Sequence, residues 1–172
     1  VKHSYIVKKT EDLPRVFKEA FHIASTGRKG PVLIDIPMDI QENEIEEFVY
    51  PESVNIIGYK PNTKGHTIQV RRAVEAIKNS KRPVIVSGGG VLLSGVKPKF
   101  RKFAEKTSIP VISTMMGIGV MPSEHELYLG MLGTHGKTVA NRALHDADLV
   151  IVCGARLGDR AVASPHQMSE NT

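Results

Sequence analysis

The sequence predicts an α/β protein: a doubly wound, parallel-sheet (Rossmann-like) domain, truncated, and preceded by a helix–strand remnant of another α/β domain. Short β-branched runs alternate with stretches of helical apolar spacing, a pattern typical of parallel strands joined by right-handed crossovers. One such run, residues 83–87, stops at three consecutive glycines, Gly88, Gly89 and Gly90. A glycine turn after a strand lets a ligand approach the backbone closely.

The first predicted elements lie before residue 40. Thr10 is the expected N-cap of a helix, whose apolar face recurs at helical spacing and whose end is marked by Gly27. Residues 30–37 form an apolar run bounded by glycine and prolines, which predicts a buried strand. Residues 38–65 show no sustained period and contain several prolines and glycines, as a connection between domains does.

A second alternating unit begins near residue 66. Val70, Ala73, Val74 and Ile77 predict one apolar helix face. Strands are expected over 83–87, 109–113 and 148–153. A helix is expected around 96–104 and another over 138–147, and 115–136 is expected to be a loop rich in glycine and methionine. The predicted divisions of the chain are therefore 1–40, 41–65 and 66–172.

Composition excludes several function classes. Lys and Arg exceed Asp and Glu, 23 against 18, but they form no basic run, so we expect no nucleic-acid partner. Apolar runs are too short for a membrane span. The single cysteine, Cys153, excludes an internal disulfide and suits a reducing compartment, the cytoplasm or an organelle matrix. The chain begins at Val1 without an initiator methionine, and we expect it to be a segment of a larger protein.

Three glycine-bearing loops follow the predicted strands: 88–90, 114–119 and 154–160. Ligands of doubly wound sheets bind outside the carboxyl ends of the strands, so these loops are expected to converge on one edge. Free amide groups and a helix N-terminus after residue 88 would favour a phosphate. The alternative is a tight turn that binds nothing.

Individual side chains are less specific. Arg156 and Arg160 offer planar donors suited to phosphate, but either could instead form a solvated ion pair with Asp159. His135 precedes a predicted helix, a position where histidine is more often structural than catalytic. No Ser/His/Asp set and no metal-ligand spacing occurs in the sequence.

Several segments together resemble the large, catalytic subunit of acetolactate synthase, a thiamine-diphosphate enzyme. Lys2-His-Ser-Tyr5 is similar to K-H-N-Y of that family, and residues 30–37 resemble the end of its pyrimidine-binding domain. Residues 114–119 resemble T-L-M-G-L-G, 131–136 resemble M-L-G-M-H-G, and 154–160 resemble G-A-R-F-D-D-R.

The resemblance implies that 1–40 end a pyrimidine-binding domain, 41–65 connect domains, and 66–172 form most of a central FAD-binding domain. The implied FAD contacts are Gly88, Gly89, Gly90, Thr114, Met115, His135, Gly154, Arg156 and Arg160. Asp159 and Arg160 would lie at the mouth of the substrate channel. Family members bind thiamine diphosphate and magnesium through residues that fall outside this segment, which therefore contains no catalytic residue.

The implied activity is the condensation of two pyruvates, or of pyruvate and 2-oxobutyrate, with loss of CO2, in branched-chain amino-acid biosynthesis. The resemblance further implies a homodimer or homotetramer of catalytic subunits and a small regulatory subunit. We expect this segment alone to be inactive. It also departs from the family pattern at Met38, Thr134 and Gly158, and residues 58–65 contain lysines but no arginine.

Three alternatives remain at this stage. The chain could belong to another thiamine-diphosphate carboligase or oxidase. It could be a non-catalytic module that binds ADP or NAD, or a structural domain that binds no nucleotide.

Overall fold

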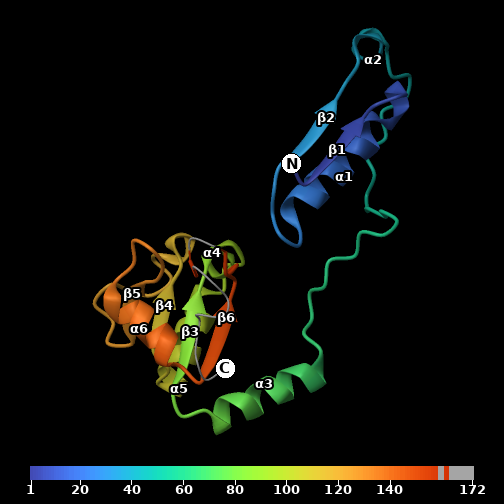
Figure 1. Cartoon of the computed structure of the whole chain (residues 1–172). Coiled ribbons are helices and arrows are strands. Elements are labelled where there is room, and N and C mark those ends of the chain that lie inside the picture. The colour runs from blue at the N-terminus through green and yellow to red at the C-terminus, as the bar shows by residue number, and fades with distance from the viewer. Residues whose placement is uncertain (159–160, 163–172) are drawn as a thin grey trace. The chain divides into compact units, whose positions relative to one another are not determined.

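The computed structural model describes residues 1–158, 161 and 162 (Figure 1). The chain divides into two compact units, Val1–Gly65 and His66–Thr172.

The first unit is a β-α-β arrangement. Strands β1 (His3–Ile6) and β2 (Val32–Asp35) pair in parallel, and α1 (Leu13–Ser25) connects them after a 3₁₀ turn, η1 (Thr10–Asp12). A short helix, α2 (Met38–Glu42), follows β2. Val7, Val16 and Ile40 form the buried core of this unit. The predicted helix is therefore confirmed as α1, and its apolar face covers the strand pair.

Four details of the first unit differ from the sequence prediction. The strand expected to be buried, β2, has no buried residue, and its Leu33 is 55% exposed, because β2 belongs to a sheet of only two strands. The chain begins with a strand, β1, where only a motif was recognised. Helix α2 lies within the stretch expected to be irregular, and it crosses residue 40. Thr10 is buried in the 3₁₀ turn, and α1 begins at Leu13 with no side-chain cap from Asp12. Pro14 in the first turn starts the helix without such a cap.

The second unit contains a four-stranded parallel sheet in the order β5-β4-β3-β6. Its elements are α3 (Thr67–Asn79), β3 (Pro83–Ser87), α4 (Gly89–Leu93), α5 (Lys97–Thr107), β4 (Val111–Ser113), η2 (Met115–Gly117), β5 (Tyr128–Met131), α6 (Thr138–Asp146) and β6 (Leu149–Cys153). The chain moves outward from β3 to β5 and then returns to place β6 on the other side of β3. The reversal creates a topological switch point between β3 and β6.

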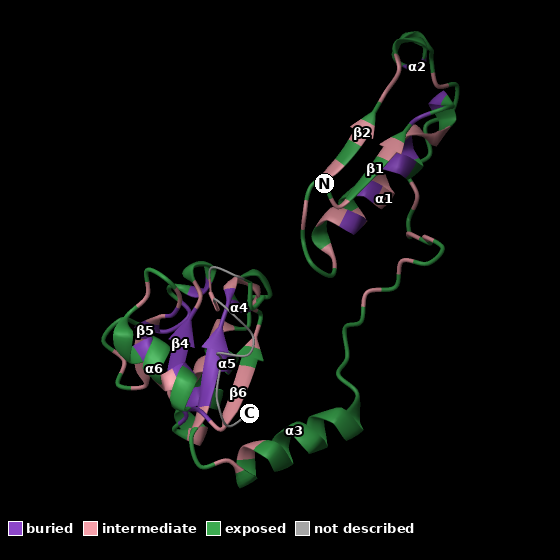
Figure 2. Cartoon of the chain, in the orientation of Figure 1, coloured by how far each residue is buried: buried purple, intermediate pink, exposed green. Residues whose placement is uncertain are grey.

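Helices cover both faces of this sheet, as a doubly wound fold requires (Figure 2). One core contains Ile85 with Phe100 and Ala104 of α5. The other contains Val84 and Val86 with Ala140 and Leu144 of α6, and it occupies the opposite face. Successive residues of β3 therefore enter opposite cores, which explains its continuous apolar run. The predicted fold class is confirmed.

One prediction for the second unit is wrong. The segment expected to be one loop contains an edge strand, β5. The sequence does not indicate this strand, because it is short, contains Gly130 with a φ of +101° and pairs with β4 through an irregular register. The predicted helix over residues 70–77 is confirmed as α3, but no residue of α3 is buried. Of its predicted apolar face, Ile77 packs against the core, whereas Val70 and Val74 are 54% and 44% exposed.

Candidate functional site

The loops after β3, β4 and β6 meet at the carboxyl edge of the sheet, as predicted. The amide of Thr114, after β4, donates to the carbonyl of Ser87 at the end of β3 at 2.9 Å. The amide of Gly88, after β3, donates to the carbonyl of Cys153 at the end of β6, also at 2.9 Å. The loop after β5, which carries His135, leaves from the same edge because all four strands are parallel. Four loops therefore leave from this edge, and the three after β3, β4 and β6 adjoin at the switch point.

The glycines at the switch point pack against one another. A Cβ on Gly88 would lie 2.3 Å from the carbonyl oxygen of Gly154, and one on Gly90 would lie 2.8 Å from the Cα of Gly154. Gly154 has a φ of +62°, and its own Cβ would meet the amide nitrogen of Val91 at 2.6 Å. These glycines are therefore required by the contact between two loops, whether or not a ligand is bound.

This packing corrects the expectation that the glycine amides are free. The amide of Gly90 donates to the carbonyl of Gly154 at 2.8 Å, and that of Gly88 is also used within the protein. Helix α4 has only five residues, so it presents a short dipole. The backbone carbonyls of Cys153 and Gly154 thus take up amides that were expected to bind an anion.

The side chains of the predicted site remain accessible. Met115 is 77% exposed, and His135 and Arg156 are also exposed, whereas Thr114 is half-buried. A guanidinium, an imidazole and a hydroxyl can bind phosphate or ring heteroatoms, and a thioether can contact a flat ring. Asp159 and Arg160 lie outside the described residues.

Two helices bind the backbone of these loops through side chains that are absent from the predicted site. Arg101 of α5 donates from Nε to the carbonyl of Val120 at 2.7 Å. Asn141 of α6 accepts from the amide of Gly133 at 2.8 Å and donates to the carbonyl of the same residue at 3.0 Å. Neither residue stands in a recognisable motif. The only sequence signal was an interior helix position with a polar side chain after a glycine loop.

One ionisable group at this edge, Cys153, is poorly suited to catalysis. Burial raises the pKa of the Cys153 thiol, which opposes its use as a nucleophile. Among the described residues, no group of three or more His, Cys, Asp or Glu side chains could hold a metal ion. None of the helices in residues 1–158 has the length and apolarity needed to cross a membrane.

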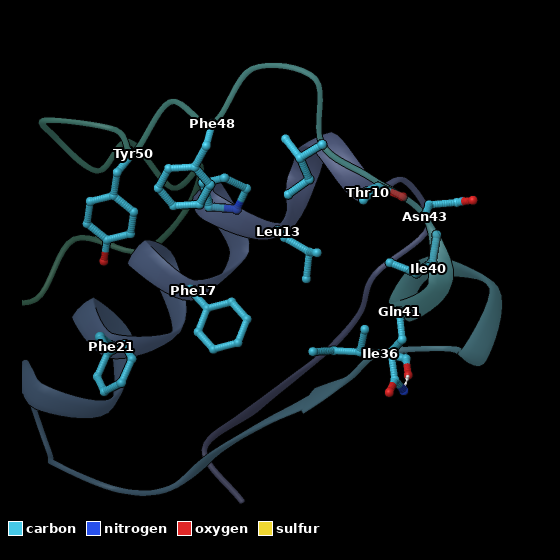
Figure 3. A pocket seen from close by; sticks show the side chains of 12 residues that line it. Thr10, Leu13, Phe17, Phe21, Ile36, Ile40, Gln41, Asn43, Phe48 and Tyr50 are labelled. Atoms are coloured by element: carbon cyan, nitrogen blue, oxygen red, sulfur yellow. Dashed lines mark hydrogen bonds between the residues drawn. The ribbon is translucent and has the colours of Figure 1, made fainter.

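The first unit has an open groove of about 530 Å³ between α1, α2 and the segment that follows (Figure 3). Phe17 and Phe21 of α1 line it opposite Phe48 and Tyr50. Its twelve lining residues include no carboxylate, imidazole or amine, and none of them belongs to the predicted site. The groove is an uncovered, largely apolar surface, and its polar side chains are the hydroxyls of Thr10 and Tyr50 and the amides of Gln41 and Asn43.

The second unit matches a family model described as the central domain of thiamine pyrophosphate enzymes, over residues 70–172. The chain belongs to this family. Among solved structures, the chain resembles a protein of Mycobacterium smegmatis described as a "putative thiamin diphosphate-dependent enzyme", with a TM-score of 0.79 and 26% identity over 100% of this chain and 32% of that one. Benzoylformate decarboxylase from Polynucleobacter necessarius gives a TM-score of 0.75 at 26% identity, over 91% of this chain and 29% of that chain.

Curated relatives share a higher sequence identity with the chain than these two structures do. The "Probable acetolactate synthase large subunit" of Methanocaldococcus jannaschii is 47% identical over 161 residues, covering 92% of this chain and 27% of that protein. The acetolactate synthase isozyme 3 large subunit of Escherichia coli K12 is 43% identical over 162 residues, covering 93% of this chain and 28% of that protein. The resemblance inferred from the motifs is confirmed. The chain spans less than a third of the length of these relatives.

Proposed function

We propose that this chain is a segment of an acetolactate synthase large subunit. The whole protein would condense two pyruvates, or pyruvate and 2-oxobutyrate, with loss of CO2, to supply branched-chain amino-acid biosynthesis. The observation that carries the proposal is the identity of 43% and 47% to proteins of that name over more than nine-tenths of the chain. An enzyme of another name, benzoylformate decarboxylase, shares the fold at 26% identity.

The carboxyl edge of the second unit is the proposed FAD site. The contacts would be Gly88, Gly89, Gly90, Thr114, Met115, His135, Gly154, Arg156 and Arg160, with Asp159 and Arg160 shaping the substrate channel. Support comes from the three loops that meet at the switch point, from the loop after β5 at the same edge of the sheet, and from the exposed Met115, His135 and Arg156. Because the amides of Gly88 and Gly90 already have partners, the side chains, more than these two amides, would hold the ligand.

The remaining parts of the proposal concern the whole protein. Thiamine diphosphate, when bound, supplies the electron sink for decarboxylation, and residues outside this chain would hold it together with Mg²⁺. The partners would be further catalytic subunits, in a homodimer or homotetramer, and a small regulatory subunit. The location would be the cytoplasm or an organelle matrix. This segment alone would not form acetolactate.

A flavin titration tests the FAD assignment directly. The purified 172-residue chain, and in parallel the whole polypeptide that its gene encodes, would be titrated with FAD, ADP and NAD, following flavin fluorescence and thermal shift. FAD should bind with the highest affinity. Equal affinity for ADP or NAD would favour a nucleotide-sensing module, and no binding to either protein would leave a structural domain.

Substrate profiling of the whole polypeptide tests the activity. With thiamine diphosphate and Mg²⁺, pyruvate should yield acetolactate and CO2, whereas the 172-residue chain should yield none. A whole protein that consumes benzoylformate but not pyruvate would contradict the proposal. Turnover of pyruvate by the 172-residue chain would show that catalytic residues were overlooked in this segment.

A further inference from the structure

We propose that Asn141 and Arg101 are positioning residues of the carboxyl-edge site, each holding one of its loops in place before a ligand binds. The inference rests on the proposed FAD site. It adds two residues that lie outside the motifs and that bind the backbone of the loops.

Asn141 binds both polar groups of Gly133. Its carboxamide oxygen accepts from the Gly133 amide at 2.8 Å, and its nitrogen donates to the Gly133 carbonyl at 3.0 Å. A flipped carboxamide would oppose donor to donor and acceptor to acceptor, so the pairing determines its orientation. The side chain thus satisfies both backbone polar groups of Gly133.

The loop that Asn141 holds is already tightly wound. Lys137 donates its amide to the carbonyl of Met131 at 2.8 Å, and Gly136 donates to that of Gly133 at 2.9 Å. A Cβ on Gly136 would lie 2.4 Å from the Met131 oxygen. Gly133 is therefore held both by a hydrogen bond within the loop and by Asn141 of α6. The exposed His135 lies between Gly133 and Gly136, whose backbones are both hydrogen-bonded.

Arg101 acts on the loop after β4 from the other face of the sheet. Its Nε donates to the Val120 carbonyl at 2.7 Å, and a second guanidinium nitrogen lies 3.5 Å from the Gly119 carbonyl. Val120 is fully buried, and its own amide donates to the carbonyl of Gly117 at 3.1 Å. A charged donor on a carbonyl forms a stronger hydrogen bond than a neutral one, so Arg101 fixes the end of the loop that begins at Thr114 and Met115.

These contacts give the site a ligand-independent shape. One anchoring side chain comes from α5 and the other from α6, and these helices contribute to the cores on opposite faces of the sheet. A loop held before binding loses less conformational entropy when the ligand arrives. Loss of either side chain should therefore lower the affinity for the ligand, because the loop is then no longer held in place before binding.

The test compares matched variants on the same helices. Asn141→Ala removes both bonds to Gly133, whereas Asn141→Asp keeps the acceptor and loses the donor. Arg142→Ala, on the same helix and at a side chain 81% exposed, is the control. Arg101→Ala and Arg101→Lys are compared with Lys102→Ala, an exposed position on α5.

Two readouts separate positioning from general stability. Hydrogen exchange without ligand should become about tenfold faster in residues 131–137 for Asn141→Ala, and in 115–121 for Arg101→Ala, with the β3 amides unchanged. FAD affinity should fall about tenfold, and the visible circular dichroism of FAD at saturation should change. Asn141→Asp and Arg101→Lys should lie between wild type and alanine, and the two controls should match wild type.

The outcomes distinguish this inference from the function it rests on. If wild type binds no FAD, the proposed function fails, and the positioning role fails with it. If wild type binds FAD and the alanine variants bind it equally well with an unchanged dichroism band, only the positioning role is overturned. Faster exchange across β3 as well as the loops would show a general stabilising role, and that result also overturns the inference.

Discussion

Substituting alanine for single glycines at the switch point tests whether these glycines serve loop packing or ligand binding. Four positions separate the two physical reasons for glycine, which are space and backbone conformation. Gly88 has an extended backbone, with a φ of −124°, but no room for a Cβ. Gly154 has a positive φ and no room, Gly119 has a positive φ and open space, and Gly158 has open space without a positive φ.

The structure sets the expected losses of unfolding free energy. At Gly88 the added Cβ would lie 2.3 Å from the Gly154 oxygen and 2.5 Å from the Cα of Ala155. Both are backbone atoms, so relief requires the loops to separate, at a cost of about 3 kcal/mol. Gly154→Ala adds a left-handed alanine and should cost about 4 kcal/mol. Gly119→Ala should cost about 1 kcal/mol, and Gly158→Ala about zero.

Hydrogen exchange of the β3 amides is a suitable assay, because these buried amides exchange only when the second unit opens extensively. Each factor of ten in their exchange rate corresponds to about 1.4 kcal/mol. Gly88→Ala should therefore accelerate β3 exchange about a hundredfold in the absence of any ligand.

A clear result would refute the loop-packing interpretation. If Gly88→Ala exchanges like Gly158→Ala in the free protein and loses only FAD affinity, the glycine is present for the ligand and the close contact with Gly154 is not formed. If all four variants lose similar free energy of unfolding, the claim that the space around each glycine determines the cost of a Cβ is wrong.

Three further predictions concern stability. The hydroxyl of Ser80 and the amides of Lys81 and Arg82 lower the pKa of Asp148 to about 2. The contribution of the Asp148 carboxylate to the free energy of unfolding should therefore be complete above about pH 4 and be lost as the pH falls from about 4 to 2. Acid titration of the Asp148→Asn variant should lack that loss. In urea unfolding, Phe100→Ala, at a core side chain, should cost about 3–5 kcal/mol, and Phe103→Ala, 37% exposed, much less. Tyr59→Phe removes the acceptor of a 2.8 Å bond from Lys2, which should make limited proteolysis at 59–65 several-fold faster while cleavage within α1 stays slow.

Residues with a strong local signal were located correctly from the sequence. Strand β3 has the predicted bounds, because an uninterrupted β-branched run between a turn and a glycine triplet has few alternatives. Helices α1, α5 and α6 follow from apolar residues at helical spacing. The convergence of loops was also predictable, since parallel strands place their carboxyl ends on one edge whatever the side chains are.

Elements that depend on distant partners were not predictable. Strand β5 is short and contains Gly130. It forms because β4 lies beside it and because the hydroxyls of Tyr128 and Ser113 are hydrogen-bonded at 2.7 Å. The apolar face of α3 was predicted, but its exposure was not, because periodicity indicates which residues share a face and not whether anything covers them.

At the site, the sequence by itself determined which loops meet, because strand polarity and the positions of glycine are local properties of the chain. The tertiary structure alone decided what the glycines do there. The amide of Gly90 is used by a carbonyl 64 residues away along the chain, that of Gly154, and no pattern near residue 90 encodes the distance between them. The same holds for Asn141 and Arg101, since a side chain's hydrogen-bond partner depends on how helices pack on the sheet, and many sequences with the same periodicity pack differently.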